Sequence, residues 1–243
     1  MIRSDQMLDQ TIQLTAEQQH YLYRVLRLAA GEQFIALNGR GGQWLVSLTE
    51  DSGRATVLQS LDEDPAPQPA ITLAVAIPKG SGFDDLVRQT TELGVTTLQP
   101  LLTQRTLHRP NPKKLERWRR IAAEATEQSE RLWLPILEDP LPWTEFAARP
   151  GVGQRYICVA RQPAPSLLTH LQRLEEDCRQ LSITIATGPE GGWTAAELDQ
   201  AVASGFCPVS LGPTILRAVT APLAALAVVT AVVNSFSRGD ISE

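Results

Sequence analysis

The sequence predicts an α/β protein with a mostly parallel sheet, preceded by a small β-rich module. From about residue 70, apolar runs of strand length alternate with stretches of helical period, which indicates parallel strands covered by helices. Before them, three strand-like runs are separated only by turn residues, as in antiparallel hairpins. An acidic, proline-rich stretch at 62–69 lies between the two patterns. We therefore expect a stiff linker there and domains at 1–64 and 70–243.

The first module is expected to begin with a helix. Thr15-Ala16-Glu17-Gln18 is a capping-box pattern, and apolar residues at roughly helical spacing follow it until Gly31. Arg24 and Arg27 fall on the other side of that helix. Strands are then expected at 33–37, 43–49 and 54–61, the first two joined by a glycine-rich turn at 38–42.

The second domain is expected to alternate strands and helices. Strands are predicted at 71–77, 95–102, 156–160 and 181–186, with a short run at 206–210. A helix is predicted at 83–93. Asn111-Pro112 should cap and open a helix whose apolar stripe includes Trp118, and Thr194-Ala195-Ala196-Glu197 should open another.

The last predicted helix starts near Thr220 and is apolar almost all round. Residues 218–237 carry no charge, but they are rich in alanine and contain threonine, asparagine and serine. Such a composition favours burial in a soluble protein over a membrane span. One side can face the sheet, and a second subunit is the natural cover for the other, so we expect a homodimer.

Composition narrows the possible classes of function. The 243 residues carry a formal net charge of −5. This charge argues against a protein that binds nucleic acid over its whole surface, but not against a local basic patch. Cys158, Cys178 and Cys207 are scattered, as in reduced cytosolic proteins. The three histidines are scattered too, so no metal site is expected. The first residues lack the apolar segment of a signal peptide, and we expect a cytoplasmic protein.

Two glycine-containing turns, at 187–193 and 211–217, each follow a strand-like run and precede a helical one. In α/β proteins such turns form a ligand crevice at the carboxyl ends of the strands, and glycine lets the backbone approach a ligand closely. Ordinary tight turns are the alternative, but two of them together favour a site. Neither turn has a phosphate-loop ending or a dinucleotide fingerprint, so the ligand is not expected to be held by phosphates.

Basic residues gather just after a predicted strand end. They are Arg105, His108, Arg109, Lys113, Lys114, Arg117, Arg119 and Arg120. The cluster is either a phosphate-binding edge or a solvated helix face paired with Glu116 and Glu124. Trp118, on the apolar stripe, is expected in the core.

Several motifs together identify a family resemblance. The main ones are Gly188-Pro189-Glu190-Gly191-Gly192-Trp193 with Glu197, and Leu211-Gly212-Pro213 with Ile215-Leu216-Arg217. Supporting them are Glu92-Leu93-Gly94-Val95, Glu127-Gln128-Ser129 and the run at 20–27. With these motifs, nearly the whole chain resembles the RsmE-type family of SPOUT methyltransferases, which methylate N3 of a uridine in small-subunit (16S) ribosomal RNA.

The resemblance implies a PUA-like RNA-binding β-barrel domain followed by a knotted (trefoil) methyltransferase domain that dimerises through C-terminal helices. It also implies S-adenosylmethionine (S-adenosyl-L-methionine) as cofactor and ribosomal RNA or the assembled 30S subunit as partner. The implied cofactor-binding residues are Thr187, Gly188, Gly191, Leu211, Gly212, Ile215 and Leu216. The expected RNA-binding residues are Arg24, Arg27, Arg105, Arg109, Lys113, Lys114 and Arg117.

Arg217 is the first candidate for a catalytic or substrate-orienting residue, since a guanidinium can stabilise charge on the uracil carbonyls; a salt bridge at a helix start is the alternative. Glu190 either acts on the substrate or caps loop amides. The chain departs from the family pattern at Val219, where glutamate is usual, at Thr214, where arginine is common, and at Glu130, where glycine is common.

Two other functions remain open from the sequence. The chain could be a related RNA methyltransferase with another rRNA or tRNA target. It could also be a non-catalytic RNA-binding dimer that lost turnover through the change at Val219.

Overall fold

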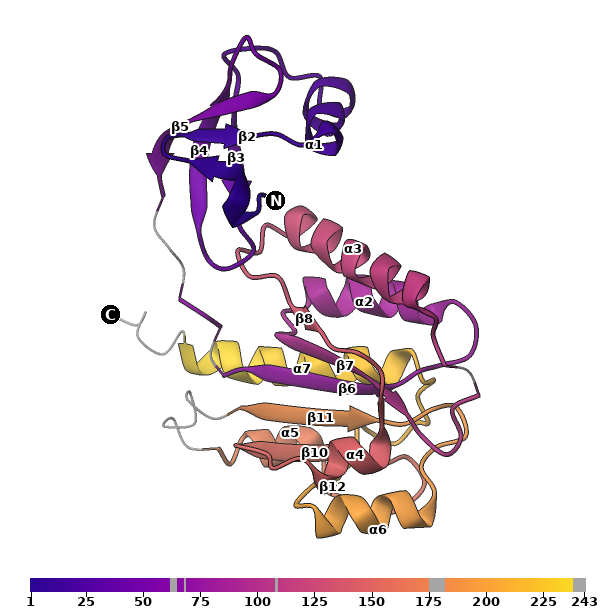
Figure 1. Ribbon diagram of the computed structural model, residues 1–243. Helices are drawn as coiled ribbons and strands as arrows, with labels where there is room; N and C mark the ends of the chain where they lie inside the picture. Colours follow the sequence, from indigo (N-terminus) through magenta and orange to yellow (C-terminus); the bar gives the residue numbers. More distant parts are fainter. Residues whose placement is uncertain (62–64, 68, 108, 175–181, 238–243) are drawn as a thin grey trace, which may run out of the picture. The chain divides into compact units, whose positions relative to one another are not determined.

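The computed structural model describes residues 1–61, 65–67, 69–107, 109–174 and 182–237 (Figure 1). The chain divides into two compact units, one comprising Met1–Ala66 with Thr126–Leu134, the other Pro67–Ala125 with Pro135–Glu243. Much of the predicted linker, with His108 and Cys178, lies outside the described residues.

The first unit contains a five-stranded antiparallel sheet in the order β1-β2-β5-β4-β3. Its elements are η1 (Ser4–Gln6), β1 (Met7–Leu8), β2 (Thr11–Gln13), α1 (Ala16–His20), η2 (Tyr21–Val25), β3 (Gln33–Leu37), β4 (Gln43–Leu48) and β5 (Arg54–Ser60). The three longer strands confirm the prediction. The two short strands were not predicted, because two or three residues carry too little periodicity to detect.

The helix after Thr15 departs from its predicted course. The capping box is confirmed, with Thr15 Oγ1 accepting from the Gln18 amide. The helix then continues as the π-helix η2 and stops before Arg27, whose φ is 59°, so the predicted end at Gly31 is wrong. Because π-helical turns depart from the 3.6-residue period, the predicted apolar face is mostly on the surface: Tyr21 and Val25 are 41% and 56% exposed.

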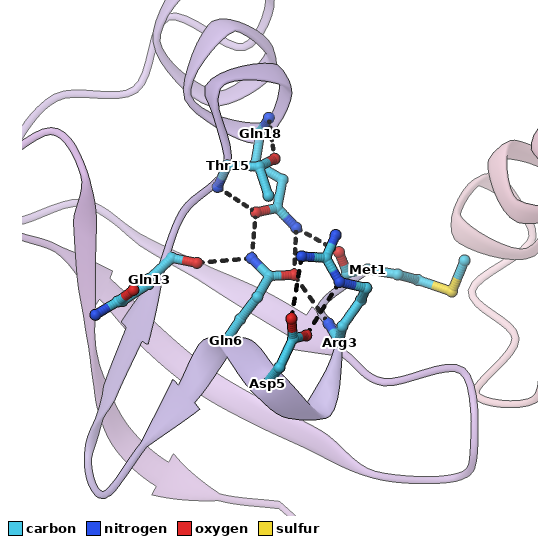
Figure 2. A network of polar contacts seen from close by, with 7 residues as sticks. All are labelled: Met1, Arg3, Asp5, Gln6, Gln13, Thr15 and Gln18. Atoms are coloured by element: carbon cyan, nitrogen blue, oxygen red, sulfur yellow. Dashed lines mark hydrogen bonds and ion pairs between the residues drawn. The ribbon is translucent and has the colours of Figure 1, made fainter.

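A glutamine network fixes this short helix to the rest of its unit (Figure 2). The buried Gln6 donates through Nε2 to the Gln13 carbonyl at 2.6 Å and to Gln18 Oε1 at 2.7 Å. Gln18 in turn accepts from the Thr15 amide and donates to the Met1 carbonyl, at 2.8 and 2.7 Å. Since α1 has no buried residue of its own, these bonds replace the apolar packing that usually anchors a helix.

Glu130, which stands where the family commonly has glycine, adopts a φ of 56°. A side chain costs about 1–2 kcal/mol in this left-handed region. We therefore expect Glu130→Gly to raise the free energy of unfolding by about 1 kcal/mol, measured by urea denaturation. Glu130→Ala is the control because it keeps the strained Cβ, and a glycine variant no more stable than the alanine variant would contradict the prediction.

The second unit is built on a seven-stranded sheet in the order β12-β10-β11-β6-β7-β8, with β9 also beside β7. The strands are β6 (Ile71–Ala76), β7 (Thr97–Leu102), β8 (Ile136–Leu137), β9 (Leu141–Pro142), β10 (Gln154–Cys158), β11 (Ile183–Thr187) and β12 (Cys207–Val209). All the pairings described are parallel. The α/β class and the parallel sheet are thereby confirmed.

Helices cover both faces of this sheet. The helices α2 (Gly82–Glu92), α3 (Pro112–Gln128), α5 (Leu167–Leu171) and α7 (Thr220–Ser237) contribute to one core cluster. The helices α4 (Trp143–Ala148) and α6 (Ala195–Ala203) contribute to the other. Neighbouring strand residues divide between them, with Leu73 and Val75 in the first cluster and Ala74 in the second, as the two-residue period of a strand requires.

Several local predictions in this unit hold. Asn111 Oδ1 accepts from the Lys114 amide at 2.9 Å, which confirms the cap of α3. Trp118 is fully buried and donates from Nε1 to Asp84 Oδ1 at 2.7 Å, so it is a core residue as predicted. Burial raises the pKa of the Cys158 thiol to about 12, and this side chain stays neutral. Within the described residues, no helix has the length and apolar character that a membrane span requires.

Candidate functional site

The two predicted turns lie at the same edge of the parallel sheet. The segment 188–193 follows β11, and the segment 210–217 follows β12. Strand β10 lies between β11 and β12 in the sheet, so its own end, at 159–160, is placed between the two turns. Parallel strands bring their carboxyl ends to one edge, where α/β proteins bind ligands.

Contacts from three neighbouring strand ends fix the segment 188–193. After β6, the Lys79 amide donates to Glu190 Oε1 at 2.9 Å. At the end of β10, the Cys158 carbonyl accepts from Trp193 Nε1 at 3.1 Å. After β7, Arg105 Nη1 donates to the Gly191 carbonyl and contacts the Trp193 carbonyl at 3.5 Å. The loop is therefore held by two backbone groups and one side chain that come from far away in the sequence.

Glu197 extends this bracing to the start of α6. The predicted capping box is present, with Thr194 Oγ1 accepting from the Glu197 amide at 3.3 Å. The Glu197 carboxylate accepts from the Thr194 amide at 2.8 Å and also from the Gln104 amide, again at 2.8 Å. This buried carboxylate thus links α6 to the segment after β7, a role that its local motif does not reveal.

The glycines of the first turn are explained by contacts inside the protein. A Cβ on Gly188 would lie 3.1 Å from the Trp193 ring, and one on Gly191 would lie 2.9 Å from Arg105 Cδ. Gly192 and Gly212 face open space but adopt φ values of 69° and 134°, which glycine tolerates best. The sequence suggested close approach of a ligand, whereas the torsions of Gly192 and Gly212, and the tight contacts a side chain would make at Gly188 and Gly191, favour glycine without one.

The predicted cofactor residues are concentrated along this edge. Thr187 is fully buried, and its Oγ1 has no hydrogen-bond partner in the described part of the chain. Leu211 packs partly buried against the core, whereas Ile215 is 63% exposed. A buried hydroxyl without a partner is uncommon. A polar group and exposed apolar side chains at one strand edge suit a ligand that is both polar and apolar.

Arg217, the predicted catalytic residue, is exposed. Its guanidinium makes no hydrogen bond or ion pair with any residue that the structure describes, so no salt bridge occupies it there. Val219 lies against the first residue of α2, since a Cβ on Gly82 would come within 2.8 Å of Val219 Cγ1. Where the family usually has a carboxylate, this chain makes an apolar contact.

The basic cluster divides into paired and unpaired residues. Arg117 pairs with Asp84 at 2.8 Å, and Lys114 lies over the Trp118 ring and donates to the Gly80 carbonyl at 3.4 Å. Arg119 and Arg120 also form ion pairs, with Asp139 and Glu124. Arg109 and Lys113 are exposed and make no such contact with described residues. Arg24 and Arg27 belong to the other unit and are likewise exposed.

A metal centre finds no support in the described residues, which contain no group of three or more histidine, cysteine, aspartate or glutamate side chains placed to hold an ion.

Two family models match the chain. One, an RNA methyltransferase domain, covers residues 64–230, and the other, an RNA methyltransferase PUA domain, covers residues 14–58. Ribosomal RNA small subunit methyltransferase E of Synechocystis is 46% identical over 97% of this chain and 78% of that protein. The protein of the same name from Bacillus subtilis is 29% identical over 90% of each chain.

Solved structures agree with these sequence matches. Ribosomal RNA small subunit methyltransferase E from Neisseria gonorrhoeae, bound to S-adenosyl methionine, superposes with a TM-score of 0.80 at 32% identity, over 93% of this chain and 94% of that one. A putative methyltransferase from Legionella pneumophila in complex with the same cofactor gives 0.82 at 26% identity, over 95% of each chain. The chain therefore belongs to the ribosomal RNA small subunit methyltransferase E family.

Proposed function

We propose that this chain transfers a methyl group from S-adenosylmethionine to N3 of a uridine in small-subunit ribosomal RNA, in the cytoplasm. The observation that carries the proposal is the placement of the segments 187–193 and 210–217 at one edge of the parallel sheet. A relative with the same fold, 32% identical, binds S-adenosyl methionine. The uridine N3 position follows from the family resemblance of the motifs.

The residues at this edge fit the cofactor. The Thr187 hydroxyl, which has no partner in the described part of the chain, offers a hydrogen bond. Backbone groups of Gly188, Gly191 and Gly212 can recognise the edge of an adenine. Ile215 and Leu216 supply apolar cover from the second turn. The cofactor, when bound, supplies a methyl group on a positively charged sulfur.

We assign Arg217 to the substrate uridine, which it would orient and stabilise. N3 of uridine must lose a weakly acidic proton before or as it accepts the methyl group. An unpaired guanidinium near the uracil carbonyls would stabilise the negative charge that this loss creates. The carboxylate of Glu190 is engaged by the Lys79 amide, so we assign it to holding the loop and not to the reaction.

Exposed cations that have no partner among the described residues are assigned to the RNA. Arg109 and Lys113 in the second unit, and Arg24 and Arg27 in the first, are exposed and can contact phosphates. Phosphate contacts of this kind position an RNA and weaken as salt rises.

The test is transfer of labelled methyl from S-adenosylmethionine to small ribosomal subunits that lack their native methylation. Naked rRNA and tRNA are assayed alongside, and the product nucleoside is identified by mass spectrometry. We expect 3-methyluridine in the small-subunit RNA. Another methylated nucleoside, or label in tRNA, would favour a related RNA methyltransferase. Cofactor binding without transfer to any RNA would favour a non-catalytic RNA-binding protein.

A homodimer through α7 is part of the proposal. Leu226 and Val229 of this helix are buried against the sheet, while Ala227 and Ala231 are exposed one turn apart. We expect a dimer at micromolar concentration by light scattering, and Ala227→Glu should yield monomers because it places a charge on the small-residue face. The control, Ala196→Glu, puts the same charge on exposed α6. A monomeric wild-type protein would refute the dimer.

A further inference from the structure

We infer that Arg105 is a positioning residue that holds the loop 188–193 in shape, and that Gly191 is glycine because Arg105 lies on it. The sequence placed Arg105 among the candidate RNA contacts. The inference rests on the proposed function in one respect: the shape of this loop matters for turnover only if the loop binds the cofactor.

Arg105 joins two segments that are far apart in the sequence. Arg105 follows β7, whereas the loop follows β11, and β6 lies between these strands in the sheet. The two segments come together beyond the strand ends, since Arg105 Cβ lies 3.5 Å from a Cβ built on Gly191. At this range Arg105 Nη1 donates to the Gly191 carbonyl and contacts the Trp193 carbonyl. Both acceptors are backbone groups of the loop, so the contact depends on the loop's conformation.

The stem of Arg105 also covers Gly191. A Cβ built on Gly191 would lie 2.9, 3.5 and 3.7 Å from Cδ, Cβ and Cγ of Arg105, its three nearest atoms. Only the distance to Cδ is shorter than van der Waals contact, so a methyl group there would have to displace the outer part of the Arg105 side chain, which carries the guanidinium. Gly191 and Arg105 therefore form one unit, in which the missing side chain of one makes room for the other.

The other contacts hold the loop on either side of Gly191, and Arg105 holds it at Gly191 itself. Glu190 is tied to the Lys79 amide, and the Trp193 indole to the Cys158 carbonyl. Arg105 bonds to the residue between these two ties. Without it, we expect the segment around Gly191 to open more often while both ends stay attached.

Hydrogen exchange of the free protein tests the role of Arg105 without cofactor or RNA. Arg105→Ala should speed amide exchange about tenfold at Gly192, whose amide donates to the Pro189 carbonyl within the loop, as expected when a local opening becomes easier. Arg88→Ala is the matched control, because it removes an exposed arginine of α2 whose ion pair, with Asp85, lies away from the loop. Unchanged exchange in Arg105→Ala would overturn the inference, whatever the protein's activity.

A double-mutant cycle tests whether residue 191 is glycine because of its contact with Arg105. We expect Arg105→Ala and Gly191→Ala each to weaken S-adenosylmethionine binding about tenfold by calorimetry, and the double variant to be no weaker than Arg105→Ala alone. If the two losses of affinity multiply in the double variant, Gly191 contacts the ligand independently of Arg105, and this account is overturned. If the wild-type protein binds no S-adenosylmethionine, the proposed function fails, while the exchange experiment still decides the role of Arg105.

The salt dependence of RNA binding separates this role from a phosphate contact. Loss of one phosphate-binding cation reduces the slope of log K against log salt by about one, where K is the association constant for RNA. We expect Arg105→Ala to leave this slope unchanged. A reduced slope with normal loop exchange would return Arg105 to the RNA-binding residues.

Discussion

Arg217→Ala is expected to lower kcat for methyl transfer about 100- to 1,000-fold, the usual cost of losing one group that stabilises developing charge. The affinity for S-adenosylmethionine should stay close to that of the wild-type protein. Arg217 is exposed, and its guanidinium has no partner among the residues described, so its removal should leave fold stability unchanged. Single-turnover transfer to small subunits, with calorimetric cofactor binding, gives both quantities.

Two further variants sharpen this test. Arg217→Lys keeps the charge but loses the planar fork, and it should recover only part of the rate. Arg149→Ala removes an exposed arginine before β10, at the opposite edge of the sheet, and should behave as wild type. An Arg217→Ala protein with normal kcat and raised KM would mean that this residue binds RNA and does not assist the reaction.

Glu197→Ala should cause the largest loss of stability among the site variants, about 3 kcal/mol, because it leaves two partly buried backbone amides without their charged acceptor. The carboxylate is only 2% exposed and accepts from the Gln104 and Thr194 amides and from Thr194 Oγ1. Urea denaturation measures the change in the free energy of unfolding. Glu197→Gln keeps one acceptor oxygen and should lose less.

Thr194→Ala separates the two roles of Glu197. That variant removes the helix cap alone, at a typical cost of about 1 kcal/mol. The excess loss in Glu197→Ala then measures the bonds that the carboxylate accepts from the Gln104 and Thr194 amides. If both variants lose the same free energy, the link between α6 and the segment after β7 contributes nothing to stability.

Features set by neighbouring residues in the chain could be predicted from the sequence. The capping boxes at Thr15 and Thr194 and the cap at Asn111 depend on three or four consecutive residues, and all three are present. The longer strands follow from runs of apolar residues. The π-helix η2 could not be predicted, since its exposed Tyr21 and Val25 fit an ordinary amphipathic helix equally well.

Contacts between distant segments could not be predicted, because they depend on the order of strands in the sheet. Strand β6 comes first in the second unit but lies between β7 and β11. That order alone lets Arg105 reach Gly191 and the Lys79 amide reach Glu190. The same holds for Val219, whose contact with Gly82 joins the last helix to the first of its unit. The trefoil knot that the resemblance implies stays a prediction.

The loop that follows β11 ends in an indole that belongs to the aromatic cluster beneath α4 and α6. The ring centroids of Trp193 and Trp143 are 4.7 Å apart, and Trp143 also contacts Phe206 at 5.4 Å. A shift of the loop must change the surroundings of two tryptophans at once. The protein thereby carries an intrinsic fluorescent probe of its own ligand loop, one that reports on the loop without any label.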